Sequence, residues 1–566
     1  MNVGLQAKEK PMVDSIEQGS ENTWQSVKEI VQDAESWLLN IQRKLYKWSR
    51  ANPDDAYRDM WNLVTDLRNL RIAWIRVSGN RGARSSGADK VRVKDIEQRP
   101  GIKRFLAKVQ QELRSGVYCP TPVRRVMIPK RGKPGQTRPL GVPTVKDRVV
   151  QAAILQILEP IFEAEFLPVS YGYRPGKSCR DALEHIRNAI RPTGKNTKTD
   201  WRRPPYQWVI EGDIKGCFDN IDHHSVMTRL RRRVKDKKVN RTVLAFLKAG
   251  ILHKGEFFHT TVGTPQGGIL SPILANIVLS AIEERYSRYV QWSHRKDGKP
   301  YARPGDQLRK FRHYERKAGR PVFLPIRYAD DFVVLVTGNE EQALAEKEAL
   351  AVFLRDEMKL TLSPEKTHVT DLTKGFIFLG HRVRLRWDNR WGYWPRVEIP
   401  KDRIHGLYER IKIRTCRHQL NCSFQQVIDM VNPLVRGWGN YYRHCYNAKA
   451  IFRRADHYVW DRLRRWLVKK HPKTSIRLIY RNYWKRLPNR NRSCWADKRP
   501  VALMADIKVE RHNLIKLRYP DYATTSESPV HNERCTPGLG MRGAETAGGN
   551  PGEAPPPYIH LKKQGQ

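Results

Sequence analysis

The 566-residue sequence is poor in cysteine, in acidic residues and in long apolar runs. Its eight cysteines form no C-x-x-C pair and no dense cluster, which excludes a disulfide scaffold and favours a reducing compartment. No apolar run is long enough to cross a bilayer, and the N-terminus lacks the apolar core of a secretory signal. These absences argue against a secreted or membrane-spanning protein and predict a cytoplasmic location.

The shortage of acidic residues leaves the chain strongly basic. Asp and Glu number 58 against 105 Lys and Arg, so the formal net charge is +47. Such an excess predicts a polyanionic partner, most simply nucleic acid, with a basic structural protein as the alternative on charge alone. Residues 1–60 hold 8 basic and 10 acidic residues, whereas residues 401–520 hold 29 and 8. The C-terminal third is therefore predicted to bind a phosphate backbone.

Two adjacent carboxylates, Asp330 and Asp331, stand between short runs of β-branched and aromatic residues. Apolar runs around a pair of turn-tolerant residues predict a β-hairpin. Two aspartates at a buried turn repel each other unless a cation lies between them, so we interpret them as metal ligands. For an isolated Asp-Asp pair, a surface turn is the commoner explanation. The rest of the chain must decide between the two.

A third carboxylate, Asp213, ends the apolar strand predicted at residues 208–213. A lone aspartate at a strand end is usually a cap, so only the combination with the hairpin is informative. Phosphoryl transfer by two metals needs carboxylates from different strands that converge on two Mg²⁺ ions roughly 3.5–4 Å apart. Three aspartates at two strand ends meet this requirement.

The remaining pattern alternates helices, strands and loops. Periodicity and turn residues predict two helices at 24–73 separated at Pro53, a basic hairpin at 123–143, a buried helix at 149–162, a glycine-containing loop at 170–178, an apolar helix at 273–282, an inserted loop or arm at 295–320, a helix at 340–357 and a buried strand at 376–381. The first 20 or so residues and the segment after Tyr522 are predicted to be flexible.

From about Pro400 the chain becomes rich in basic residues, Trp and Tyr within helical patterns. Basic helices interleaved with aromatic residues suit RNA, whose unpaired bases stack on aromatic rings. The alternative is an ordinary helical core with a solvated basic face. The candidate RNA-binding residues are Arg436, Trp438, Tyr441, Tyr442, Arg464 and Arg465.

The ordered set of motifs resembles the reverse transcriptase–maturases encoded by group II introns. Tyr328 to Asp331 matches the Y-x-D-D box of reverse transcriptases, and in family order it is joined by residues 170–178, 213–218, 265–267, the turn at Lys366 and residues 378–380. The resemblance covers approximately residues 40–490 and implies an α/β (α+β) right-hand polymerase fold, with an antiparallel palm sheet and a helical thumb. The implied divisions are an N-terminal extension at 1–50, fingers and palm at 51–390, the thumb or maturase domain at 391–490, and a short basic DNA-binding-like segment with a tail at 491–566.

The resemblance also implies an activity and the residues that perform it. The chain would be an RNA-directed DNA polymerase with two Mg²⁺ ions, held directly by Asp213 and Asp330 with Asp331 in support. Phe218 resembles the aromatic gate that excludes a ribose 2′-hydroxyl, and Lys366 could protonate the departing pyrophosphate. The alternatives are that Gln266 only braces its turn and that Lys366 only caps a helix. The further candidates for contact with substrate are Gln266, Lys133, Arg138, Ile214 and Tyr328.

The implied partners are the parent intron RNA, a DNA target or primer and dNTPs, without a membrane, in a bacterial cytoplasm near the nucleoid. Many relatives carry an H-N-H endonuclease with paired C-x-x-C motifs, but Cys494 and Cys535 stand alone here. We therefore expect no nicking activity and a primer supplied from elsewhere, such as a replication fork. Two other functions remain open: an RNA-binding splicing factor without polymerase activity, and a retron-like or diversity-generating reverse transcriptase recruited to another task.

Overall fold

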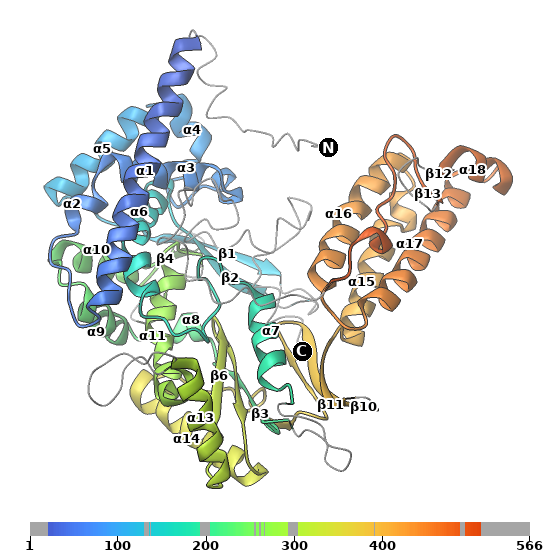
Figure 1. The fold of residues 1–566 in the computed structure, drawn as a ribbon. Coiled ribbons are helices and arrows are strands. Elements are labelled where there is room, and N and C mark those ends of the chain that lie inside the picture. The colour runs from blue at the N-terminus through green and yellow to red at the C-terminus, as the bar shows by residue number, and fades with distance from the viewer. Residues whose placement is uncertain are drawn as a thin grey trace.

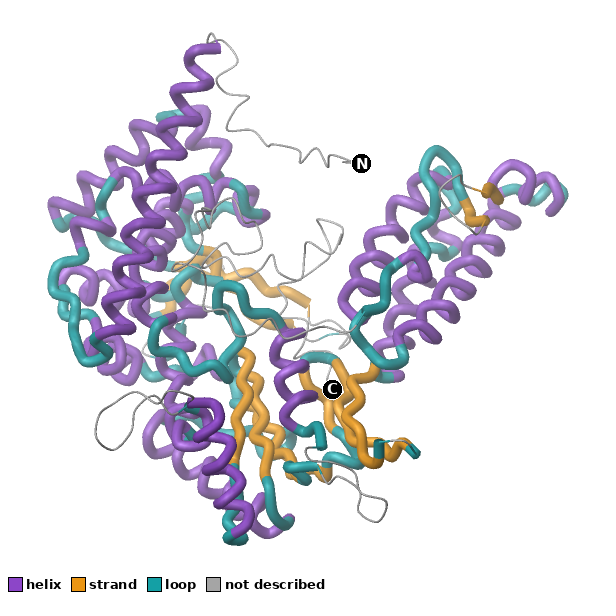
Figure 2. The backbone as a smooth tube through the Cα atoms, in the orientation of Figure 1, coloured by secondary structure: helices purple, strands orange, loops and turns teal. Residues whose placement is uncertain are grey.

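The computed structural model describes residues 21–129, 135, 137–192, 204–253, 256–259, 262–264, 267–291, 304–389, 391–486 and 493–510. N-terminal helices and C-terminal helices lie on opposite sides of a central region that contains most of the strands (Figures 1 and 2). The predicted flexible segments, before residue 21 and after Tyr522, lie outside the described residues.

The N-terminal helices pack around one almost completely buried helix, α6 (Val145–Glu163). Helices α1 and α3 lie along it, and all three contribute to the main hydrophobic core. The predicted break at Pro53 is confirmed, since α1 ends at Ala51 and the next helix begins at Trp61. The other elements of this region are α1 (Glu21–Ala51), α2 (Trp61–Val64), α3 (Leu67–Ser78), the 3-10 helix Arg81–Arg84, α4 (Val93–Gln98) and α5 (Ile102–Ser115).

A four-stranded sheet of order β2-β1-β4-β5 follows the N-terminal helices in the fingers. Strands β1 (Val123–Pro129) and β2 (Thr137–Val142) are antiparallel, which confirms the predicted basic hairpin, and β1 also pairs in parallel with β4 (Ile251–His253). Strand β5 (Glu256–Phe258) completes the sheet. Lys133 at the hairpin tip lies outside the described residues.

The palm sheet has the order β6-β7-β3-β8, and every neighbouring pair is antiparallel. Its strands are β3 (Trp208–Asp213), β6 (Phe323–Tyr328), β7 (Asp331–Val336) and β8 (His368–Asp371). The helices of this region are α7 (Cys179–Ala189), α8 (Cys217–Asn220), α9 (His223–Arg233), α10 (Lys237–Lys248), α11 (Ser271–Arg285), α12 (Ser287–Val290), α13 (Pro304–Lys317) and α14 (Glu340–Met358). The palm and the fingers share one hydrophobic core.

The interpretation of residues 295–320 as a loop or arm is wrong for the part that the structure describes. Residues 304–317 form α13. The Phe311 ring lies 6.0 Å from the Tyr289 ring, and Arg312 Nε donates to the Tyr289 carbonyl at 2.8 Å. The segment has many charged residues, so its sequence shows little sign of a packed helix. These contacts hold α13 against α12.

The C-terminal helices form a second hydrophobic core of their own. A three-stranded sheet of order β11-β10-β9 connects this core to the palm, and the predicted boundary at residue 391 falls within its β10–β11 hairpin. The elements are β9 (Phe376–Phe378), β10 (His381–Asp388), β11 (Gly392–Glu398), α15 (Lys401–Arg414), the 3-10 helix Arg417–Gln419, α16 (Phe424–Tyr442), α17 (Ala448–Lys470), α18 (Ile476–Tyr483), β12 (Trp484–Arg486), β13 (Ser493–Trp495) and the 3-10 helix Met504–Asp506.

Residues 493–510, the C-terminal strap, run along α16 and α17 and belong to the same core. Asn432 donates to the Pro500 carbonyl at 2.9 Å and accepts from the Ala502 amide at 2.7 Å. A Cβ at Gly439 would lie 2.4 Å from Ile507 Cδ1, so the strap packs directly against α16 at this glycine. The predicted boundary at residue 490 therefore falls inside this core, and we propose that the thumb spans residues 399–510.

Asn432→Ala is expected to lower the free energy of unfolding of the thumb by about 2 kcal/mol, because it leaves a carbonyl and an amide of the strap without their hydrogen bonds. Thermal unfolding followed by tryptophan fluorescence would measure the loss. Asn421→Ala, at an exposed position before α16, should change stability by no more than about 0.5 kcal/mol. Equal effects of the two substitutions would contradict the role of Asn432.

Candidate active site in the palm

The two adjacent aspartates lie at the β6–β7 hairpin, as the sequence predicted. Tyr328 and Asp331 form the last cross-strand pair, which leaves Ala329 and Asp330 as a two-residue turn. Ala329 has φ +59°, a left-handed conformation that is rare for a residue with a Cβ. Asp330 is only 7% exposed. The turn thus holds a carboxylate within the protein rather than at an ordinary surface bend.

The register brings a second carboxylate next to the hairpin. Asp213, at the end of β3, is directly opposite Asp331 on β7. Directly opposite residues of antiparallel strands share a face, with Cβ atoms about 4.5–5.5 Å apart. The sequence analysis paired Asp213 with Asp330, whereas the strand register places Asp331 opposite Asp213 and Asp330 in the adjoining turn.

A lysine from the following turn reaches the same carboxylate. Lys366 Nζ lies 3.5 Å from Asp213 Oδ2. The turn is fixed against β3 because the Ser363 amide donates to the Asp213 carbonyl at 2.8 Å. Lys366 is thus beside Asp213, and its ammonium partly neutralises that carboxylate.

A buried arginine holds the turn from behind. Arg327 is fully buried, and its guanidinium donates to Glu283 Oε1 at 2.8 Å, to Asn276 Oδ1 at 2.9 Å, to the Ala329 carbonyl at 2.9 Å and to Ser170 Oγ at 2.8 Å. One side chain therefore ties the left-handed residue of the turn to α11 and to the loop before α7. This role of Arg327 was not among the sequence predictions, although a charged residue inside an apolar strand is a signal for it.

The loop at 170–178 packs its backbone against the same turn. A Cβ on Gly172 would lie 2.1 Å from the Ala329 amide nitrogen. The Tyr171 amide donates to the Arg327 carbonyl at 2.9 Å, and Asn276 donates to the Gly172 carbonyl at 2.8 Å. The predicted glycine-containing loop is therefore approached closely by a backbone, that of the protein's own catalytic turn. Arg174 is not available for a ligand, since it is buried in an ion pair with Glu163.

Gly172→Ala is expected to lower kcat for DNA synthesis by about 100-fold, because the added methyl group must displace the turn that carries Asp330. Steady-state kinetics on a primed RNA template would measure kcat and KM separately. Gly406→Ala is the matched control, since apart from its own stretch of helix no described atom lies within 4 Å of the corresponding Cβ. An unchanged kcat for Gly172→Ala would contradict the packing of the loop against the turn.

The remaining substrate candidates are in different environments. Phe218, on α8, is half-buried, and its ring lies 6.2 Å from that of Tyr173. Ile214 is fully buried, so its side chain cannot contact a substrate. Contact of the substrate with the main chain of Ile214 stays a prediction. Arg138 is partly exposed on β2 opposite Ile128. Gln266 and Lys133 lie outside the described residues.

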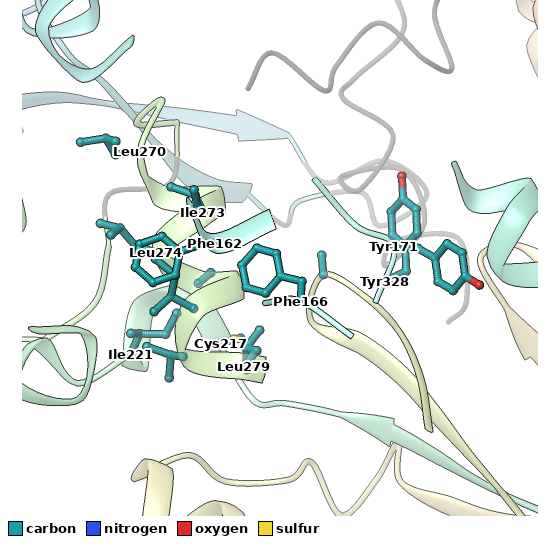
Figure 3. Close-up of a cluster of buried hydrophobic side chains, with 14 of the residues drawn as sticks. Phe162, Phe166, Tyr171, Cys217, Ile221, Leu270, Ile273, Leu274, Leu279 and Tyr328 are labelled. Atoms are coloured by element: carbon teal, nitrogen blue, oxygen red, sulfur yellow. The ribbon is translucent and has the colours of Figure 1, made fainter. Parts of the chain in front are cut away.

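Tyr328 is largely buried beside Tyr171 at the edge of the main core (Figure 3). Burial raises the pKa of its hydroxyl, and the nearby acidic groups of Cys179, Asp181 and Asp331 raise it further. Its hydroxyl therefore stays neutral in the physiological pH range. Tyr328 is therefore suited to pack beneath the site as a neutral ring and not to act as a charged group.

A divalent ion fits the carboxylates only together with a substrate. Among the described residues, no group of three or more His, Cys, Asp or Glu side chains could hold a metal by itself. Mg²⁺ in polymerase sites is usually bound by one or two carboxylates, with substrate phosphates completing the octahedron. Two opposed carboxylates with a third in the turn meet that requirement.

The predicted RNA-binding residues of the thumb fall into two groups. Trp438 and Tyr442 belong to the buried core, and the hydroxyls of Tyr441 and Tyr442 donate to the Leu379 and Gly380 carbonyls at 2.9 and 3.2 Å. In this conformation the buried rings of Trp438 and Tyr442 are not accessible to RNA, and Tyr441 and Tyr442 anchor α16 to the turn before β10. RNA binding by the partly buried Tyr441 stays a prediction. The exposed arginines are different: Arg436 and Arg465 face solvent, and Arg464 is partly exposed.

Comparisons with known proteins agree with this arrangement. Residues 128–383 match the family described as reverse transcriptase (RNA-dependent DNA polymerase), and residues 404–484 match the group II intron, maturase-specific domain. A reverse transcriptase domain implies dependence on a divalent metal ion, and a maturase domain implies binding of intron RNA. None of the described helices has the length and apolar character needed to cross a lipid bilayer.

Three relatives show the extent of the similarity. The chain is 36% identical to protein YkfC of Escherichia coli over 372 residues, which are 65% of this chain and 94% of YkfC. It is 32% identical to the group II intron-encoded protein LtrA of Lactococcus lactis over 379 residues, 62% of this chain and 60% of LtrA. It is 30% identical to a 91 kDa protein in the cob intron of Schizosaccharomyces pombe, over 60% of this chain and 46% of that protein. The resemblance inferred from the sequence is confirmed, and the chain belongs to the group II intron-encoded reverse transcriptases with a maturase domain.

Proposed function

We propose that the palm site copies RNA into DNA with Asp213, Asp330 and Asp331 as the ligands of two Mg²⁺ ions. The observation that carries the proposal is the register of β3 and β7, which brings Asp213 opposite Asp331 with Asp330 in the next position. Bound there, Mg²⁺ supplies activation of the primer 3′-hydroxyl and neutralisation of the leaving pyrophosphate.

The neighbouring side chains have separate tasks in this proposal. Phe218 excludes the 2′-hydroxyl of a ribonucleotide through its ring, which is braced edge-on by Tyr173. Lys366 Nζ, which is beside Asp213, transfers a proton to the pyrophosphate oxygen as the bond to the α-phosphorus breaks. Arg138, Lys133 and Gln266 are proposed contacts of the incoming nucleotide.

The thumb is proposed to bind the parent intron RNA and to assist its splicing. Arg436, Arg464 and Arg465 are the candidate phosphate contacts, because they are exposed or partly exposed on α16 and α17. Arg464 and Arg465 are both paired with Asp461 at 3.3 and 2.9 Å. The two guanidinium groups share a single carboxylate, so one positive charge remains to bind a backbone phosphate. The cDNA copied from the intron would serve its retrohoming.

Primer extension by the purified full chain tests the proposed activity. A DNA primer annealed to an RNA template should be extended with dNTPs and Mg²⁺, and EDTA should stop the reaction. The same chain should bind its intron RNA in a filter assay. RNA binding without any extension would refute the polymerase and favour a splicing factor.

A further inference from the structure

A cavity of about 270 Å³ lies between α7, β11 and the segment that follows α16. It is lined by Arg180, Arg187, Trp394, Arg396 and Tyr446, and by the carboxylates Glu184 and Glu510, each of which is paired with an arginine. None of the three palm aspartates lines it. Its walls come from the palm, from the connecting hairpin and from the thumb, so a ligand bound there would contact all three.

The α7 wall of the cavity presents a desolvated cation. Arg180 donates to the Asn440 carbonyl at 2.7 Å, and within the described residues it forms no ion pair with a carboxylate. Burial lowers the pKa of its guanidinium, and the charge of Arg443 lowers it further. Arg187, about two turns further along α7, is neutralised by Glu184. Asp181 stabilises the charge of Arg180 only in part, since burial still lowers the pKa of the guanidinium, and an anion that enters the cavity would stabilise it further.

The opposite wall carries two aromatic rings, Trp394 and Tyr446, each with one face covered by a guanidinium group. The Arg396 guanidinium lies 4.2 Å from the centre of the Tyr446 ring, and the Arg191 guanidinium lies 4.7 Å from that of Trp394. Tyr446 is 65% exposed, which is unusual for a large aromatic side chain at a junction between domains. Aromatic rings and guanidinium planes are the surfaces on which proteins stack unpaired bases.

We propose that this cavity holds one unpaired nucleotide of an RNA, with a phosphate at Arg180 and the base against Trp394 or Tyr446. Its volume is just below the usual range of small-molecule sites, so it admits a single nucleotide and not a duplex. An acidic peptide would satisfy Arg180 but would leave the stacking surfaces unused. The choice of RNA rests on the proposed function, in which the chain binds its intron RNA.

Photocrosslinking tests the proposal without polymerisation. Single-stranded RNA that carries iodouridine is irradiated with the full chain in the absence of dNTPs, and the crosslinked residues are identified by mass spectrometry. We expect crosslinks at Trp394 or Tyr446. Crosslinks confined to other regions would overturn the proposal while leaving the polymerase proposal intact, since the latter depends on primer extension.

Variants separate the phosphate contact from the base contact. Trp394→Leu should weaken binding of the RNA about fivefold or more, and Trp394→Phe should keep most of the affinity. Arg180→Ala should weaken binding and reduce the salt dependence by about one phosphate contact. Arg355→Ala removes the same charge from an exposed pair on α14 and should have little effect.

Competing probes identify the ligand. Unlabelled single-stranded RNA should abolish the crosslinks, and DNA of the same sequence should compete less well. A polyglutamate peptide that competes as strongly as RNA would overturn the assignment to a nucleotide. Equal losses of affinity in Arg180→Ala and Arg355→Ala would show that the cavity contributes only general charge, and would also overturn it.

Discussion

Asp330→Asn is expected to reduce DNA synthesis on a primed RNA template roughly a thousandfold, which corresponds to about 4 kcal/mol of lost transition-state stabilisation. The amide has nearly the same shape as the carboxylate but lacks the charge that binds Mg²⁺. Asp330 is largely buried in a two-residue turn, so no other side chain can easily take its position. Single-nucleotide incorporation at saturating dNTP would measure the loss in kcat.

Comparing the rates of Asp330→Asn and Asp331→Asn shows which of the two carboxylates contributes more to metal binding. If the opposed pair of Asp213 and Asp331 provides the main ligands, Asp331→Asn should be at least as harmful as Asp330→Asn. Asp356→Asn, on the exposed face of α14, removes the same charge and should leave the rate unchanged. RNA binding should be retained in all three variants. Full activity of Asp330→Asn would remove that residue from the metal site.

The strands that carry the aspartates were predictable because their sequences contain the necessary signals. An apolar run that stops at a carboxylate predicts a strand end, and two such runs around turn-tolerant residues predict a hairpin. The long helices α6, α11 and α14 were predictable for similar reasons, from continuous or periodic apolar residues. The sequence also predicted that Asp213 and the hairpin act together, since neither alone suffices for two-metal chemistry.

The partners of the hairpin were not predictable, because they come from distant parts of the chain. Ser170 precedes Arg327 by 157 residues, and Asn276 precedes it by 51. Local patterns do not encode which segments meet, nor the register that places Asp331 rather than Asp330 opposite Asp213. The same limit explains the aromatic residues of α16. The basic and aromatic composition of the helix predicted that it binds RNA. Its packing against the turn before β10 turns the aromatic rings toward the protein instead.

Arg327→Met is expected to lower the free energy of unfolding by about 3–5 kcal/mol, the usual cost of removing one partner of a buried ion pair. Glu283 would be left as an uncompensated buried charge, since it is only 1% exposed and its Oε2 has no hydrogen-bond partner. The left-handed Ala329 would lose the donor to its carbonyl. Denaturant unfolding and DNA synthesis measured on the same preparation would report the two effects.

The double variant Arg327→Met/Glu283→Gln separates stability from positioning. Removing the orphaned charge should recover much of the lost stability, because replacing both members of a buried pair is far less costly than removing one. It should not recover the rate, since the Ala329 carbonyl still lacks its donor and a displacement of the turn by about 1 Å can cost roughly 100-fold. Asp330 would then be misplaced in a folded protein, which should appear as a lower kcat with nearly unchanged KM. Recovery of stability and rate together would show that Arg327 contributes to folding alone and does not position the catalytic turn.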